Sequence, residues 1–171
     1  MSYTTEMLAN PYFKLRPPAP TFEDELCQCD PLRPIKLMDA LGYNPLHYID
    51  CNGEVTPESL ALPVDLVEPL ARWRSVVQSL YLLWLDSGAY EAWPETELSS
   101  ITSAVNQQGL AVRALLNPIR RCYFHYFQNQ TVDNFIPIQH CPSCGQTLTD
   151  YPHGIYAQLI CEQCSIITVG A

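Results

Sequence analysis

The chain has 171 residues, and its 9 Lys and Arg against 18 Asp and Glu give a formal net charge of −9 at pH 7. This length predicts one domain with a core large enough to fold without disulfide bonds. No apolar run approaches the roughly 18 residues of a membrane-spanning helix, and an acidic chain lacks the broad positive surface that non-specific nucleic-acid binding needs. Residues 1–10 contain Glu6 and no basic residue. We therefore expect no secretory signal there, a cytoplasmic location and reduced cysteines.

The first 62 residues are predicted to form a proline-rich arm of loops and short turns. Ten of the 15 prolines lie within the first 70 residues. Proline fixes φ and removes a backbone donor, so long regular elements are not expected there. Aromatic residues in this stretch, Tyr12 and Tyr48 among them, indicate that the arm packs against a folded body.

The middle of the chain, 63–134, is predicted to be a small helical core. Apolar residues recur every three or four positions from Leu66 to Trp84, which is the period of an amphipathic helix. Asp65 is a candidate cap for the start of this helix, and Gly88 is a suitable end.

Three further segments complete the core. A second helix is expected to start near Ser103 or Asn106 and to break at Pro118, with a short helical turn between 89 and 101. The aromatic run at 120–130 has a composition that fits a strand, but its spacing favours a helix.

The last part of the chain, 135–171, carries two C-x2-C pairs separated by sixteen residues. This spacing is typical of a four-cysteine zinc site, because each pair forms a tight turn that directs two thiolates towards one point. The segments 151–160 and 166–169 have strand composition, so we predict an α+β protein with a C-terminal β zinc ribbon. Four thiolates leave no open coordination position, and the one zinc ion is therefore expected to be structural. The predicted ligands are Cys141, Cys144, Cys161 and Cys164.

The remaining cysteines allow two interpretations. Cys27, Cys29, His47 and Cys51 form a C-x-C…H-x3-C set whose residue types could bind a second zinc ion. The favoured interpretation is that these cysteines are small buried residues, which is the usual role of a free cysteine. Cys122 lies in the aromatic run and is expected in the core.

Charge separates the candidate functions. The last basic residue is Arg121, so the predicted ribbon contains no Lys or Arg. This favours a non-enzymatic binding or adaptor module whose partner is a protein, or a nucleoprotein complex contacted through its protein. The alternative is direct nucleic-acid binding through arginines of the helical core. Those candidate contact residues are Arg72, Arg74, Arg113, Arg120 and Arg121.

An enzyme is a less favoured interpretation. His47, Asp50 and Cys51 place a base, a carboxylate and a thiol close together in sequence, which leaves a thiol-dependent enzyme or inhibitor around Cys51 as a second alternative. The sequence contains no P-loop, dinucleotide-binding fingerprint, H-E-x-x-H or G-x-S-x-G motif.

Several short strings are similar to a known family. Residues 44–52 read Asn-Pro-Leu-His-Tyr-Ile-Asp-Cys-Asn, and residues 83–88 read Leu-Trp-Leu-Asp-Ser-Gly. With Trp-Arg-Ser-Val at 73–76, Val-Asn at 105–106, the aromatic run at 123–127 and the cysteine pairs, they resemble an uncharacterised bacterial family of zinc-ribbon proteins. That family is described as a candidate for nucleic-acid binding. The resemblance covers about residues 40–171 and implies a zinc ribbon and a zinc ion, but no mechanism.

Overall fold

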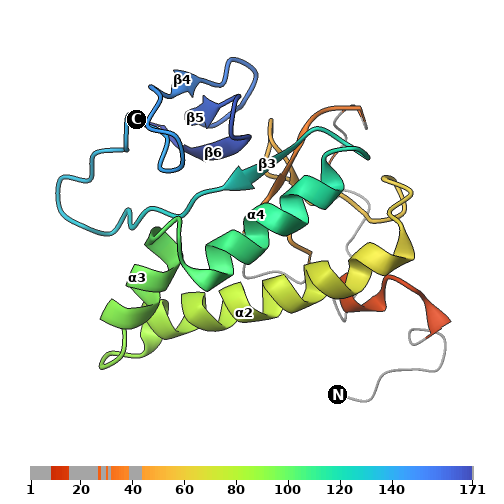
Figure 1. Cartoon of the computed structure of the whole chain (residues 1–171), viewed down its shortest axis with the longest axis horizontal. Coiled ribbons are helices and arrows are strands. Elements are labelled where there is room, and N and C mark those ends of the chain that lie inside the picture. Colours follow the sequence, from red (N-terminus) through yellow and green to blue (C-terminus); the bar gives the residue numbers. More distant parts are fainter. Residues whose placement is uncertain (1–8, 16–26, 28–29, 31, 39–43, 171) are drawn as a thin grey trace.

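The computed structural model describes residues 9–15, 27, 30, 32–38 and 44–170 (Figure 1). Much of the predicted arm lies outside these residues, including Cys29. Within the described residues, helices pack against one face of a mixed six-stranded sheet, so the α+β prediction is confirmed.

The sheet joins parts of the chain that are far apart in sequence. Its strand order is β2-β1-β3-β6-β5-β4, and β3 pairs in parallel with both β1 and β6 while the other pairs are antiparallel. The predicted arm, helical core and C-terminal part all contribute strands to this one sheet. The strands are β1 (Ile35–Leu37), β2 (Leu46–Tyr48), β3 (Cys122–His125), β4 (Thr149–Asp150), β5 (Gln158–Cys161) and β6 (Ile166–Val169).

The helices follow the predicted pattern closely. The described helical elements are η1 (Phe13–Leu15), η3 (Val64–Leu66), α2 (Val67–Asp86), α3 (Ala92–Ser99) and α4 (Ala104–Leu116). Gly88 follows α2 with φ of +65°, and the side chain of Ser103 accepts a hydrogen bond from the Asn106 N–H at the start of α4. None of the described helices is both long enough and apolar enough to cross a membrane.

Two sequence predictions in this region were wrong. Asp65 does not cap α2, because it lies inside the 3-10 turn η3 that precedes the helix. The run at 120–130 is not a helix but contains β3. This strand lies between two parallel neighbours, and both of its faces are covered. Residues that point to either face are therefore apolar, and the sequence lacks the alternation of apolar and polar residues that marks a half-exposed strand.

The helices meet the sheet at Phe124. Its ring lies 6.1 Å from that of Trp73 in an edge-to-face arrangement, and the Trp73 indole N–H donates to the Val105 carbonyl at 3.1 Å. Gly109 of α4 fits between these rings, since a Cβ at this position would lie 2.4 Å from the Phe124 ring. The close approach of α2, α4 and β3 therefore requires glycine at position 109.

Polar contacts on the opposite face tie the C-terminal part to the body. Glu162 accepts hydrogen bonds from the Tyr123 hydroxyl at 2.8 Å and from the Arg121 guanidinium at 2.6 Å. Asp50 similarly accepts from the Tyr151 hydroxyl at 2.5 Å and pairs with Arg33. The part of the chain that carries the C-x2-C pairs is thus held to the rest by side chains as well as by the sheet.

Candidate metal centre

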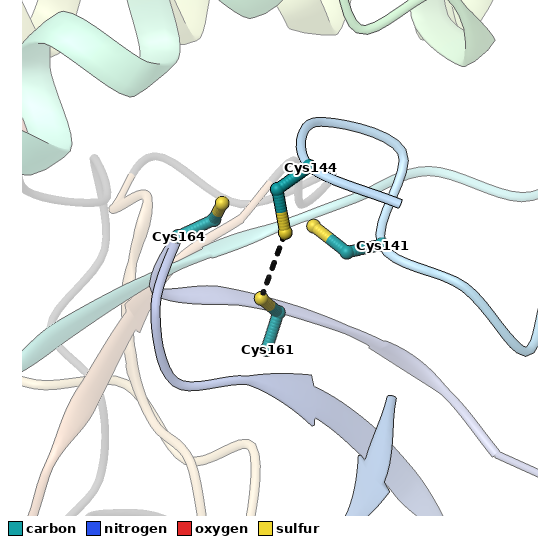
Figure 2. Close-up of side chains that lie close together, drawn as sticks. All are labelled: Cys141, Cys144, Cys161 and Cys164. Carbon is teal, nitrogen blue, oxygen red and sulfur yellow. Dashed lines mark hydrogen bonds between the residues drawn. The ribbon is translucent and has the colours of Figure 1, made fainter. Parts of the chain in front are cut away.

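Four cysteine side chains converge at the C-terminal end of the molecule. Their sulfur atoms all lie within 4.8 Å of one another. Figure 2 shows two of them coming from a loop before β4, one from the end of β5 and one from the β5–β6 turn, with the sulfurs turned towards a common centre. These are the predicted residues Cys141, Cys144, Cys161 and Cys164, and together they could hold a metal ion.

The first pair lies in a tight turn. The Gly145 N–H donates to the Cys141 carbonyl at 2.9 Å, and the Cys141 N–H donates to the Gln146 carbonyl at 2.7 Å. Gly145 has φ of +74°, a conformation in which a residue with a Cβ is strained. This is the reason for a glycine directly after Cys144.

The second pair repeats this geometry with a different residue. Ser165 follows Cys164 as Gly145 follows Cys144, and it has φ of +49°. A serine is less favourable than glycine in this region of φ. Its buried position and its carbonyl bond to the Phe124 N–H hold it there, since that bond continues the pairing of β3 with β6.

The sulfur spacing is compatible with tetrahedral coordination. The Cys144 and Cys161 sulfurs are 3.7 Å apart (Figure 2). Zinc–sulfur bonds of about 2.3 Å at tetrahedral angles place two sulfurs about 3.8 Å apart. Four thiolates with this spacing suit zinc among the metals common in proteins, because soft sulfur ligands in a tetrahedral set favour it.

The thiols differ in how readily they ionise. A hydrogen bond from the Gln146 backbone N–H lowers the pKa of the exposed Cys144 thiol to about 7. Burial raises the pKa of the other three thiols, which are Cys141, Cys161 and Cys164. Cys144 is therefore the first ligand to become a thiolate, and a cation is required to hold all four as thiolates near neutral pH.

The candidate centre belongs to a small hydrophobic core that extends beyond the C-terminal part. Cys141 and Cys161 are buried in one cluster with Leu148, Leu159 and Ile166. Leu110 of α4 and Ile101 pack against the same cluster. The apolar cluster around the cysteines therefore also contacts helix α4.

The proposed second metal site is only partly described. Cys29 lies outside the described residues, while the Cys27 and Cys51 sulfurs lie 3.0 Å apart. His47 is buried, and its Nδ1 and Nε2 atoms lie 2.9 Å and 3.0 Å from the carbonyl oxygens of Asn52 and Asn44. In this arrangement neither ring nitrogen faces the two sulfurs as a ligand would.

The catalytic set suggested around Cys51 is not assembled in this structure. His47 makes the carbonyl contacts just described, and the Asp50 carboxylate is held by Tyr151 and Arg33. A thiol enzyme needs its base within hydrogen-bond reach of the sulfur. Cys122 is completely buried, as predicted, and burial raises its pKa to about 12.

The five candidate arginines lie in the predicted helical core, but they are not equally accessible to a nucleic acid. Arg72 is exposed on α2. Helix α4, which carries Arg113, runs in the opposite direction to α2 (Figure 1). Arg113 on α4 and Arg120 after it are partly buried, as is Arg74. Arg121 forms an ion pair with Glu162 and lies over the Tyr123 ring at 5.1 Å.

The contacts of Glu162 could not be predicted from the sequence, because its partners are about forty positions away.

Comparison of the chain with family models, with curated proteins and with solved structures gave no match. The family resemblance of the short sequence strings therefore stays a prediction.

Proposed function

We propose that this chain is a zinc-ribbon protein in which one structural zinc ion stabilises a binding module for a macromolecular partner, without catalytic activity. The observation that carries the proposal is the convergence of four cysteine sulfurs from two tight turns. A zinc ion bound by four thiolates has no position left for water or substrate. Such an ion stabilises local structure rather than activating a reactant.

The position of the cysteines supports a structural ion. Cys141 and Cys161 are buried among apolar side chains, and β5 and β6 leave the second cysteine turn as an antiparallel pair. Without a cation, thiolates in this environment repel one another, and thiols leave the two turns without a crosslink. The ion accordingly fixes the geometry of the sheet edge formed by β6, β5 and β4.

Charge favours a protein partner. The chain has 18 acidic against 9 basic residues, and none of the basic residues follows Arg121. Arg121 itself is paired with Glu162, and this ion pair weakens the attraction of its guanidinium for a phosphate. An acidic surface is suited to a basic protein or to the protein component of a nucleoprotein complex. Cytoplasmic location remains part of this proposal.

An affinity-capture experiment tests the choice of partner. The tagged, zinc-loaded full chain is used to capture proteins from a lysate of its native host, with and without nuclease treatment, and these are identified by mass spectrometry. We expect a defined protein to be retained after nuclease treatment and to bind again when purified. Binding that depends on intact nucleic acid would contradict the proposal.

Direct nucleic-acid binding is tested in parallel. The full chain is titrated with single- and double-stranded DNA and RNA at low and moderate salt, next to an Arg72→Ala/Arg113→Ala variant. Phosphate contacts weaken steeply as salt rises, because binding releases counterions. We expect no binding at either salt concentration. Salt-sensitive binding that the double variant loses would instead support the arginine-bearing helices as the interface.

A further inference from the structure

The turn after β2 is fixed by several hydrogen bonds. The Tyr48 N–H donates to the Gly53 carbonyl at 2.9 Å, and the Asn52 N–H donates to the Tyr48 carbonyl at 3.1 Å. Asn52 has φ of +60°, and its side-chain oxygen accepts from the buried Lys36 ammonium. Cys51 lies in this turn, so these hydrogen bonds fix the backbone from which its side chain projects.

Cys27 comes to the same place from a distant part of the chain. Its sulfur lies 3.0 Å from that of Cys51, although the two residues are 24 positions apart. Both side chains are half-buried and pack at the border of the main hydrophobic core. Two thiols in such proximity are placed for one of two chemistries, which are shared metal coordination and a disulfide bond.

The sulfur spacing of the Cys27–Cys51 pair favours a disulfide bond. The Cys144 and Cys161 sulfurs of the candidate zinc site lie 3.7 Å apart, close to the roughly 3.8 Å of a tetrahedral zinc site. The 3.0 Å between Cys27 and Cys51 is clearly shorter. With zinc–sulfur bonds of about 2.3 Å, it corresponds to a sulfur–zinc–sulfur angle near 80°, far from tetrahedral. A disulfide needs about 2.05 Å, which a side-chain movement of less than about one ångström would reach.

Gly53 makes room for this pair. A Cβ at position 53 would lie 2.6 Å from the Cys27 Cβ and within 3.2 Å of both sulfurs. The Gly53 N–H also points towards Cys51, with its nitrogen 3.3 Å from that sulfur. A backbone donor at this position stabilises the thiolate form, which is the form that attacks a disulfide and the form in which a sulfur leaves.

We propose that Cys27 and Cys51 form a reversible intramolecular disulfide, a redox site separate from the four-cysteine zinc site. The oxidant is a low-molecular-weight disulfide such as oxidised glutathione. The Cys51 thiolate attacks one sulfur of this oxidant, forms a mixed disulfide and releases one thiolate. The Cys27 thiolate then attacks the Cys51 sulfur and releases the second. The chain loses two protons and two electrons, and the oxidant becomes two thiols.

The test uses the zinc-loaded full chain equilibrated with mixtures of reduced and oxidised glutathione. Free thiols are trapped by alkylation at low pH, and crosslinked peptides are identified by mass spectrometry before and after reduction. We expect a crosslink that includes Cys51 at high ratios of oxidised to reduced glutathione and its disappearance when reductant is added. Wild-type protein and the Cys27→Ser, Cys29→Ser and Cys51→Ser variants are treated alike.

The variants make the assignment unambiguous. We expect the Cys29→Ser protein to form the crosslink as wild type does, and the Cys27→Ser and Cys51→Ser proteins to lose it. A crosslink that survives Cys27→Ser but not Cys29→Ser would overturn the pairing. Failure of the wild-type protein to form any crosslink to Cys51 in excess oxidised glutathione would overturn the proposal itself.

The number of zinc ions bound per chain shows whether Cys51 binds metal instead of forming a disulfide. It also tests the four-cysteine site independently of the Cys27–Cys51 pair. We expect one zinc ion per reduced chain, and the same content in the Cys51→Ser variant. Two zinc ions, falling to one in Cys51→Ser, would show that Cys51 is a metal ligand and would overturn the disulfide. Loss of zinc from a Cys144→Ser variant would leave the disulfide proposal unaffected, because the two sites use different cysteines.

Discussion

The backbone N–H of Phe124 donates a hydrogen bond of 2.8 Å to the carbonyl oxygen of Ser165, the residue after the last cysteine of the candidate metal centre. Phe124 is also the point at which α2 and α4 contact the sheet. The second cysteine turn and the helical core are therefore joined through β3, in addition to the packing of Leu110 and Ile101 against the cysteine cluster. We therefore expect zinc removal to disturb β3 as well as residues 138–171.

Removal of zinc should expose one edge of β3. We expect chelation to increase amide hydrogen exchange at Phe124 and Tyr126, whose N–H groups donate to the carbonyls of Ser165 and Ile167. The Ile35 N–H donates to the Arg121 carbonyl on the other side of β3 and serves as the internal control. Unchanged protection of Phe124 and Tyr126 in the zinc-free chain would show that the strand pairing does not depend on the ion.

Zinc binding should release protons in a number set by the cysteine pKa values. The pKa of Cys144 is about 7, and burial raises the pKa of the other three thiols. Near pH 7 the zinc-free site therefore retains most of its protons, and we expect between about three and four to be released per ion. Calorimetry in buffers of different ionisation enthalpy measures this number. Release of two or fewer would mean that not all four thiols bind as thiolates.

Replacement of Gly109 by alanine should destabilise the protein, although alanine normally favours a helix. The added methyl group would meet the Phe124 ring at 2.4 Å and the Trp73 indole nitrogen at 2.7 Å. Overpacking of this kind costs about 1–3 kcal/mol. Denaturant unfolding of the Gly109→Ala variant measures the loss. A Gly109→Ala/Phe124→Leu double variant should lose less than the sum of the single changes, and strict additivity would contradict the contact.

Ser165 should tolerate glycine and reject a β-branched residue. Its φ of +49° strains any side chain, whereas glycine adopts this conformation freely. We expect Ser165→Gly to change the free energy of unfolding by less than about 0.5 kcal/mol, because relief of strain is offset by the greater freedom of the unfolded chain. Ser165→Val should cost about 1–3 kcal/mol. Equal effects of the two substitutions would argue against backbone strain as the cause.

Stability should decrease as the pH falls below about 6.5 through the titration of His47. Burial lowers the pKa of this imidazole, so the unfolded chain takes up a proton at a pH where the folded chain does not. The contribution of His47 to the free energy of unfolding is therefore fully present above the unfolded pKa and is lost as the pH falls towards the folded pKa. A His47→Gln variant should show a shallower pH dependence between pH 7 and the folded pKa. An unchanged slope would assign the effect to other groups, such as the cysteine ligands.

The cluster of four cysteines and the helices could be predicted from the sequence because their signals are local. Cysteine spacing determines which thiols can meet, and a period of three to four residues identifies α2. The identity of β3 could not be predicted in this way, because it is buried on both faces only after distant strands β1 and β6 pair with it. The contacts of Glu162 with Tyr123 and of Asp50 with Tyr151 are likewise set by tertiary structure, over separations of 39 and 101 positions.

We propose that one zinc ion is bound by four thiolates, with no water in its coordination shell. X-ray absorption at the zinc edge, with metal analysis of the same sample of the purified full chain, tests this claim most directly. We expect one zinc ion per chain with four sulfur neighbours at about 2.3 Å and no lighter ligand. A nitrogen or oxygen atom in the coordination shell, or a chain that binds no zinc while all four cysteines are reduced, would contradict it.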